Sequence, residues 1–328
     1  MTMLQIHRLR LTRLSAAAAA VGALAAGGVL ALGPSSYAGT GPASATSPSS
    51  QKVPSYTFTA LDNANDPTFN QLLGINDSGE IAGYFGSGAT GHPNRGYTLV
   101  APYGQANYTN EDFPGAQQTQ VTGLNNRAIT VGFYADTAND NFGFVDDNGR
   151  YSVVIDPNTP SMTAGINQLL GINDHHLAVG FYNDLNGISH GYEVNLHSYN
   201  FTPVSPPGTT GSTATGINDQ GDVSGFTTSS TGTMVGFLLK GKNFTTLSFP
   251  GATQTQAFGV NNHDQVVGDY VGVDGVAHGF VYSNGTYTGI DDPNGLGTTT
   301  INGINNAGDI VGFYIDSAGN TDGFLGRP

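Results

Sequence analysis

The chain has 328 residues, of which 38% are hydrophobic and only 10% are charged, and its formal net charge at pH 7 is −14. An acidic surface repels a phosphate backbone, so this charge disfavours nucleic-acid binding. The sequence contains no cysteine, which excludes a disulfide framework and a thiol nucleophile. Stability must therefore come from a hydrophobic core, and a chain of this length can bury a large one.

The N-terminal segment is typical of a secretory signal peptide. Three arginines precede an apolar, alanine-rich run over residues 15–32, and small residues that suit cleavage follow. We predict a signal peptide over residues 1–45, a flexible Gly/Pro/Ser/Thr-rich linker over 46–54 and a mature domain over 55–328. Removing the three arginines would shift the net charge from −14 to −17.

The alternative for this segment is an N-terminal membrane anchor. No later segment approaches the roughly 18 apolar residues that a membrane helix needs. We therefore expect a secreted, extracellular protein without a membrane span, either free or associated with the cell wall.

Six copies of one short pattern organise the rest of the chain. Each copy reads Gly-aliphatic-Asn, a polar turn, an apolar run and, later, Gly-aromatic, and residues 303–314 are the plainest copy. The leading glycines are spaced by 49, 48, 45, 43 and 44 residues and are Gly74, Gly123, Gly171, Gly216, Gly259 and Gly303. Each repeat holds four strand-like pieces, and turns such as Asn284-Gly285 are typical of β-hairpins. This predicts an all-β, six-bladed β-propeller of four-stranded antiparallel blades, with a β-solenoid as the alternative.

The lengths of the connections predict where the blades begin and end. Only the link between the first and second strand-like pieces is consistently long, so it suits the crossing from the outer strand of one blade to the inner strand of the next. The last blade is then one strand short, and an unpaired strand near Tyr56 begins the repeat region. We predict that this N-terminal strand pairs with the C-terminal blade, which closes the ring and removes both sheet edges.

Several segments resemble the HAF family of bacterial extracellular repeats. The matching segments are residues 244–252 and 303–314, together with His190-Gly191-Tyr192 and His278-Gly279-Phe280, and the resemblance covers residues 55–326. It implies a secreted repeat protein and supports the propeller, but it brings no catalytic residues to transfer. The other copies depart from the family at the histidine position, where they carry Arg95, Phe142, Val235 and Asp322.

Candidate ligand-binding residues lie on the face that should carry the longer loops. Glutamines at the start of four inner strands, with Thr213 and Thr300, should ring the mouth of the central channel; they are Gln71, Gln120, Gln168 and Gln256. An amide ring can bind sugars through hydrogen bonds, and a hydrogen-bond ladder between blades is the alternative. His190 and His278 could bind ligand, transfer protons or bind metal, or else cap a neighbouring backbone group.

Carboxylates in the turns between the third and fourth pieces are candidate metal ligands. We single out Asp136, Asp184 and Asp316 for Ca²⁺, which prefers roughly six to eight oxygen ligands. The alternative is structural, because Asp in hairpin turns commonly bonds its own backbone. Asp269 is the oddest position, since it replaces an aromatic residue in a column expected to be buried and would need a partner if charged.

These observations favour a monomeric, secreted propeller that binds carbohydrate or another extracellular ligand. The alternatives are an extracellular hydrolase or lyase and a structural or adhesive cell-wall protein. The sequence lacks GxSxG, HExxH and phosphate-loop motifs, so it predicts no catalytic residues and leaves enzymatic activity open. An enzyme would need a unique cluster with carboxylates about 5–10 Å apart.

Overall fold

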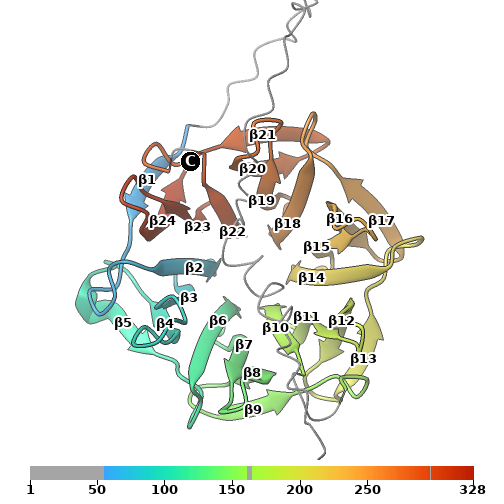
Figure 1. Ribbon diagram of the computed structural model, residues 1–328, viewed down its shortest axis with the longest axis horizontal. Coiled ribbons are helices and arrows are strands. Elements are labelled where there is room, and N and C mark those ends of the chain that lie inside the picture. Colours follow the sequence, from blue (N-terminus) through green and yellow to red (C-terminus); the bar gives the residue numbers. More distant parts are fainter. Residues whose placement is uncertain (1–54, 161–164, 296) are drawn as a thin grey trace, which may run out of the picture.

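The protein is an all-β, six-bladed β-propeller, which confirms the fold predicted from the repeats. The computed structural model describes residues 55–160, 165–295 and 297–328, so the predicted signal peptide and linker lie outside the described residues. Six four-stranded antiparallel sheets surround a central axis (Figure 1). One short 3₁₀ turn, η1 (Gln105–Asn107), is the only helical segment of these residues, and none of their helices could span a membrane.

Each blade runs from an inner strand at the channel to an outer strand at the rim. The inner strands are β2 (Asn70–Ile75), β6 (Gln118–Leu124), β10 (Asn167–Ile172), β14 (Gly211–Ile217), β18 (Gln254–Val260) and β22 (Thr300–Ile304). The second strands are β3 (Ile81–Phe85), β7 (Thr130–Ala135), β11 (Leu177–Asn183), β15 (Val223–Thr228), β19 (Val266–Val271) and β23 (Ile310–Ile315). The third strands are β4 (Arg95–Leu99), β8 (Asn141–Asp146), β12 (Ser189–Asn195), β16 (Met234–Lys240), β20 (Ala277–Ser283) and β24 (Thr321–Arg327). The outer strands are β5 (Tyr108–Asn110), β9 (Tyr151–Val154), β13 (Asn200–Pro203), β17 (Asn243–Leu247), β21 (Thr286–Ile290) and β1 (Thr57–Ala60).

The ring is closed by the N-terminal strand, as predicted. Strand β1 is the outer strand of the sixth blade and pairs with β24, with Thr57 opposite Arg327 and Ala60 opposite Phe324. The rings of Phe58 and Phe324 pack edge to face at 5.3 Å. Because β1 occupies the open edge of β24, the last blade has the same four strands as the others (Figure 1).

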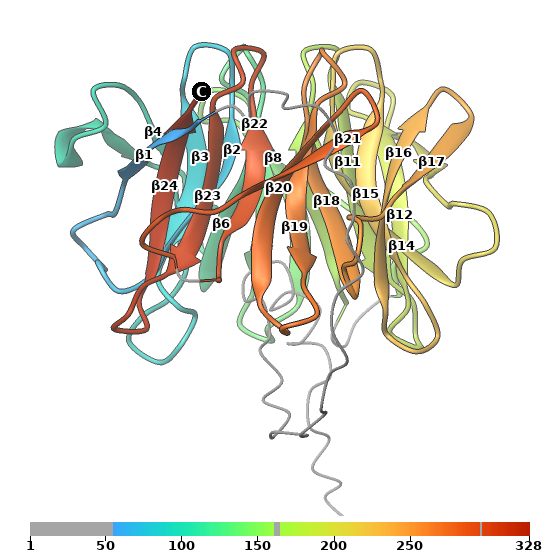
Figure 2. The ribbon, with the colours of Figure 1, turned by 90° about the horizontal axis from the view of Figure 1, so that it is seen from above.

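The strands run between two faces of the disc (Figure 2). We call the side with the turns between inner and second strands the turn face; it is at the top of Figure 2, where the C-terminus lies. The opposite side, which carries the links between blades and the turns between second and third strands, is the loop face. Hydrophobic side chains fill the spaces between blades: Val131 of the second blade clusters with Leu169 and Tyr192 of the third. Burial of each such side chain contributes about 1.5–3 kcal/mol.

A ring of six glycines brings the inner strands together around the channel. It consists of the leading glycines of the repeats, Gly74, Gly123, Gly171, Gly216, Gly259 and Gly303. A Cβ added to any of them would lie 3.1–3.2 Å from the Cα of the next, and at Gly216 it would also lie 2.5 Å from the carbonyl oxygen of Phe258. A larger residue at any of these positions would push against the backbone of the next inner strand, which explains the glycine in every copy.

Each inner strand carries a β-bulge immediately before its ring glycine. In the first blade the register with the second strand shifts between Leu72 and Gly74, which leaves Leu73 unpaired. Five of these register shifts have the same form, and in the fifth blade the shift lies between Ala257 and Val260. A bulge re-aims one side chain, and here it turns the residue before each ring glycine toward the channel.

The asparagine of each Gly-aliphatic-Asn copy locks one blade to the next. Its Nδ2 donates to the backbone carbonyl of the equivalent asparagine in the following blade, over 2.9–3.2 Å. The six bonds form a closed ring of Asn76, Asn125, Asn173, Asn218, Asn261 and Asn305. The Oδ1 atom is used as well: that of Asn173 accepts from the backbone nitrogens of His175 and Leu177 within its own turn. Only a short side chain with both a donor and an acceptor can do this.

A second closed ring lies one residue further along the chain. The backbone nitrogen of each member donates to the side-chain oxygen of the next blade's member over 2.8–2.9 Å. Its members are Asp77, Asn126, Asp174, Asp219, Asn262 and Asn306. These two rings line the turn-face opening of the channel. Twelve repeated hydrogen bonds therefore hold this end of all six blades in register.

Candidate functional site: the loop-face mouth of the channel

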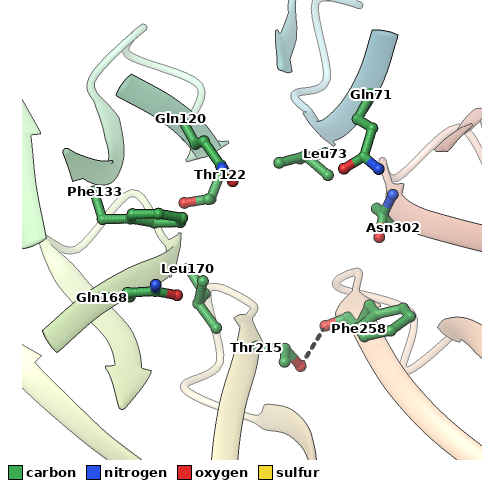
Figure 3. A pocket seen from close by; sticks show the side chains of 10 residues that line it. All are labelled: Gln71, Leu73, Gln120, Thr122, Phe133, Gln168, Leu170, Thr215, Phe258 and Asn302. Atoms are coloured by element: carbon green, nitrogen blue, oxygen red, sulfur yellow. Dashed lines mark hydrogen bonds between the residues drawn. The ribbon is translucent and has the colours of Figure 1, made fainter. Parts of the chain in front are cut away.

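The loop-face end of the channel contains a small cavity of about 50 Å³. Three of the four predicted glutamines line it, and their side chains surround a common space with those of the bulge residues (Figure 3). The fourth glutamine, Gln256, is buried but does not belong to the lining. The bulge residues are irregular in type: Leu73, Thr122, Leu170, Thr215, Phe258 and Asn302.

Several of the polar lining groups satisfy neighbouring backbone rather than face the cavity. The hydroxyl of Thr122 donates to the carbonyl of Leu169 in the next blade at 2.8 Å. The hydroxyl of Thr215 donates to the carbonyl of Phe258 at 2.9 Å, as drawn in Figure 3. These bonds join each threonine to a backbone carbonyl of the next blade, so the two threonines have a structural role.

The glutamines form part of a ladder between blades, which was the structural alternative for them. The Nε2 atoms of Gln120 and Gln168 donate to the Oδ1 atoms of Asn94 and Asn141 in the preceding blades, each at 3.0 Å. In the first blade the Oε1 of Gln71 accepts from the hydroxyl of the buried Tyr84 at 2.7 Å. Three of the four glutamines thus line the channel mouth, where the sequence predicted them, and Gln256 does not.

The ladder is incomplete at Gln168. Its Oε1 is buried and has no hydrogen-bond partner among the described residues. The residue opposite Gln168 in the register is Phe181, whereas Gln71 faces a tyrosine. Phenylalanine has no hydroxyl to donate, so the Oε1 of Gln168 remains an unpaired acceptor at the cavity wall. A buried unpaired polar group costs about 1–3 kcal/mol unless a water or ligand satisfies it.

A second unpaired group lies at Gln256. Its Nε2 is buried without a partner in the described part of the chain. The residue of the preceding blade that corresponds to Asn94 and Asn141 is Met234, which begins strand β16 and offers only a weak sulfur acceptor. An unpaired amide donor at Gln256 thus complements the unpaired acceptor two blades earlier.

Asp269 lies beside Gln256, opposite it in the register of β18 and β19. Its carboxylate is 6% exposed and accepts a hydrogen bond from the hydroxyl of Thr300 at 3.3 Å. Burial raises the pKa of Asp269 to about 7, and the bond from Thr300 opposes this rise only in part. The aspartate is therefore a buried titrating group near the loop-face end of the inner strand.

The structure does not bring His190 and His278 together. They occupy the third strands of blades three and five, with blade four between them. Each ring stacks on the tyrosine opposite it in the second strand, Tyr182 at 5.1 Å and Tyr270 at 5.2 Å. His190 contacts Asp184 at 3.3 Å, and His278 contacts Asp291 at 2.9 Å. Burial lowers the pKa of His278, but Asp291 and Asp274 together outweigh it, so the pKa is raised.

The three candidate calcium ligands lie in turns of three different blades. The Oδ1 atoms of Asp136, Asp184 and Asp316 each accept two backbone N–H groups of their own turn, over 2.8–3.0 Å. In the described ranges, no three histidine, cysteine or acidic side chains are close enough to hold a metal ion. The structure therefore gives each carboxylate a local role and does not assemble them into one site.

A group of carboxylates does gather on the loop face of the sixth blade. Asp62 accepts from the backbone nitrogen of Gly323 at 2.9 Å, and burial, with the nearby charges of Asp322 and Asp316, raises its pKa to about 6. Burial and the charges of Asp322, Asp292 and Asp62 raise the pKa of Tyr314 to about 12. The sequence did not single out Asp62, because it lies in the first link, outside the repeated turns.

Sequence reasoning also missed the bulge residues as channel-lining groups. The signal was present, because they are the only irregular column within an otherwise regular inner strand. The irregular column did not lead to a prediction, because in a regular strand these side chains would point to a different surface. Only the bulge turns them toward the channel.

Known structures support the fold and no more. The chain is similar to TolB from Acinetobacter baumannii, with a TM-score of 0.52 and 11% identity, over 76% of this chain and 64% of TolB. It thus spans less than two thirds of that protein. A fungal lectin from Aleuria aurantia, described as a six-bladed β-propeller that recognises fucose, matches with a TM-score of 0.49 and 11% identity, over 78% of this chain and 90% of the lectin. The sequence matches no protein-family model, and comparison with curated proteins finds no match.

Proposed function

We propose that the protein is a secreted, monomeric binding propeller of the HAF type whose loop face recognises carbohydrate. The observation that carries this proposal is the bare Oε1 of Gln168 at the wall of the channel-mouth cavity. A hydroxyl group can donate to this acceptor, and it can also accept from an unpaired amide such as the Nε2 of Gln256. Saccharides present many such groups on one face.

The size of the cavity limits what can enter it. A volume of about 50 Å³ accommodates a few waters or one hydroxymethyl group rather than a whole sugar ring. The glycan would therefore lie across the loop face and insert a single hydroxyl-bearing group beside Gln168.

A glycan-array screen followed by calorimetry on the protein tests this proposal. Gln168→Met keeps the length of the side chain and removes the acceptor, so we expect at least a tenfold loss of affinity for the best glycan. Gln220→Met makes the same chemical change on the turn face, where Gln220 is exposed and its Nε2 bonds the carbonyl of Asn262, and should leave affinity unchanged. Equal affinity of Gln168→Met and the unaltered protein would exclude the channel mouth as the binding site.

Repeating the screen with and without Ca²⁺ tests the calcium prediction. Asp136, Asp184 and Asp316 already accept hydrogen bonds from their own turns. We therefore propose that glycan binding does not depend on calcium. Loss of binding in a chelator would contradict this and restore the calcium sites.

The carboxylates around Tyr314 favour a second candidate function, an extracellular hydrolase. A carboxyl group with a pKa near 6, such as Asp62, is suited to proton transfer. In that case the glycan identified on the array would be cleaved, and Asp62→Asn would abolish the release of reducing ends without weakening binding. An intact glycan after prolonged incubation would leave binding as the function.

A further inference from the structure

Blades two and five each contain a phenylalanine from the preceding link that fills the space over the outer half of the blade. Phe113 stacks on Tyr134 at 3.9 Å and packs against Phe144 at 5.7 Å. Phe249 occupies the same place in blade five, where it stacks on Tyr270 at 3.6 Å. In both blades a Phe-Pro-Gly turn thus covers an aromatic surface with the chain's own side chain.

The link into blade four follows the same backbone path but lacks this phenylalanine. Gly208 ends the turn with φ of 79°, close to the 81° of Gly115 and the 82° of Gly251. The residues two positions before these glycines are therefore equivalent, and Pro206 stands where the other links carry Phe113 and Phe249. In Figure 2 this link is the yellow loop that projects at the right-hand side.

Blade four also lacks the tyrosine on which the phenylalanine would stack. The second-strand column that holds Tyr134 and Tyr270 has Thr227 here, and the neighbouring third-strand position, His278 in blade five, is Val235. Both partners of the stacked pair are therefore replaced together by smaller residues, and the space between the link and the blade is left open.

The result is a groove of about 340 Å³. This volume falls in the range of roughly 300–1,000 Å³ that is usual for ligand clefts. Phe237 and the half-buried Phe244 form its aromatic surface, and Thr209, Asn243 and Thr246 supply hydroxyl and amide groups. An aromatic surface edged by hydroxyl and amide groups is suited to a ring that is apolar on one face and polar at its periphery.

A lysine gives this groove a preferred ligand charge. Lys242 lines it and has no hydrogen bond or ion pair to any described residue. The other lysine of the described ranges, Lys240, bridges Asp264 at 2.6 Å and Asp222 at 3.5 Å. In a protein of net charge −14, an uncommitted cation beside an aromatic groove complements an anionic ligand.

We propose that this groove binds an acidic saccharide, with the apolar face of a sugar ring on Phe244 and its carboxylate at Lys242. The inference rests on the proposed carbohydrate-binding function but assigns it a second site, distinct from the channel mouth. The hydroxyl groups of the ring meet Thr209, Thr246 and Asn243. The ring takes the place that Phe249 fills in blade five.

The equivalent groove of blade six shows why the charge matters. It has a volume of about 440 Å³ and is lined by Tyr56, Phe58 and Asp291, and no lysine of the described residues lines it. An anionic sugar would be repelled there. A single acidic-sugar site per molecule, at blade four, is therefore expected.

Calorimetry with a galacturonic-acid tetramer and a neutral galactose tetramer tests this inference on the protein. The unaltered protein should bind the acidic tetramer at least tenfold more tightly, with a stoichiometry of one. Pro206→Phe should abolish this binding, because the new ring fills the groove as in blades two and five. Lys242→Gln, a change of an exposed side chain, should weaken it about tenfold. Lys240→Gln removes the same charge outside the groove and should have little effect.

The channel-mouth variant separates the two proposals. Acidic-tetramer binding that survives Gln168→Met but is lost in Pro206→Phe supports the groove. Binding that is lost in Gln168→Met and unchanged in Pro206→Phe and Lys242→Gln overturns the groove and leaves the proposed function standing. Failure of the acidic tetramer to bind, while other glycans bind through Gln168, overturns the groove alone.

Discussion

The two mouths of the channel are built from the two ends of the same six strands, yet they differ in order. At the turn face, every blade contributes the same asparagine and an Asp or Asn after it, and two closed rings of hydrogen bonds result. At the loop face, the equivalent positions hold four glutamines and two threonines. Gln120 and Gln168 bond the preceding blade, and among the described residues Gln168 and Gln256 each keep an unpaired polar atom. The regular turn-face mouth holds the ring together. At the irregular loop-face mouth, buried polar atoms without partners lower the stability and can bind a ligand.

Asp269 offers the largest test of this contrast, because it places a buried carboxyl at the irregular end. Its pKa is raised from 3.8 to about 7, so the folded state binds the proton more tightly than the unfolded chain. The stability contribution is complete below pH 4 and is lost as pH rises toward 7, by about 1.4 kcal/mol per pH unit and about 4 kcal/mol in total. Asp269→Asn cannot ionise, so its stability relative to the unaltered protein should rise over this interval.

Urea unfolding at pH 4, 5, 6, 7 and 8 measures that difference. Other titrating groups such as Asp62 are present in both proteins and cancel in the comparison. The difference should increase up to about pH 7 and then level off. A difference that is constant across the series would show that Asp269 is not buried as a charged group in the folded protein.

Gly216→Ala tests the glycine ring at the regular end. The added Cβ would lie 2.5 Å from the carbonyl oxygen of Phe258 and 2.7 Å from the hydroxyl of Ser224. Neither the backbone nor the short serine can move away without shifting the next blade, so we expect a loss of about 3 kcal/mol in thermal or urea unfolding. Gly104→Ala is the matched control, because its φ is −83° and its nearest contact would be the side chain of Asn107 at 3.4 Å. Equal effects of the two substitutions would contradict the ring.

Asn173→Asp isolates one bond of the asparagine ring. It keeps the oxygen that caps the turn at His175 and Leu177, but it replaces the donor to the carbonyl of Asn218 with an acceptor. Loss of this hydrogen bond, together with the repulsion between the new carboxylate oxygen and the carbonyl oxygen of Asn218, should lower the free energy of unfolding by about 2 kcal/mol. Asn173→Ala also removes the cap and should cost more. If the two variants unfold at the same urea concentration, the bridge between blades contributes nothing and only the turn cap matters.

The repeated parts of the molecule could be predicted because every blade has the same strands and turns and therefore needs the same residue types at the same positions. The spacing of the glycines, the hairpin at Asn284-Gly285 and the missing last strand were enough for the six blades and the pairing of β1 with β24. Three of the four glutamines, Gln71, Gln120 and Gln168, also line the channel mouth, where the sequence predicted them. This prediction was possible because a glutamine recurs at the same position near the start of four inner strands.

The features that distinguish one blade from another could not be predicted in this way. Whether Gln168 is satisfied depends on Phe181 across the sheet, and whether Gln256 is satisfied depends on Met234 in the preceding blade. The three predicted calcium ligands lie in turns of different blades, and each carboxylate accepts N–H groups of its own turn, which the sequence pattern alone does not show. Such outcomes depend on contacts between blades, which the pattern within one repeat does not contain.

Gln168→Met has the smallest expected effect on stability and so is the sharpest measure of the difference between the two mouths. The substitution removes the bond from Nε2 to Asn141 at 3.0 Å, but it also removes the unpaired Oε1 from a buried site. Loss and gain should nearly cancel, leaving a change below about 1 kcal/mol in urea unfolding. If Gln168 can be replaced without loss of stability, stability does not account for its unpaired acceptor at the cavity wall, whereas ligand binding does. A cost of 2 kcal/mol or more would instead make Gln168 a structural residue like Asn173, and the contrast between the two mouths would disappear.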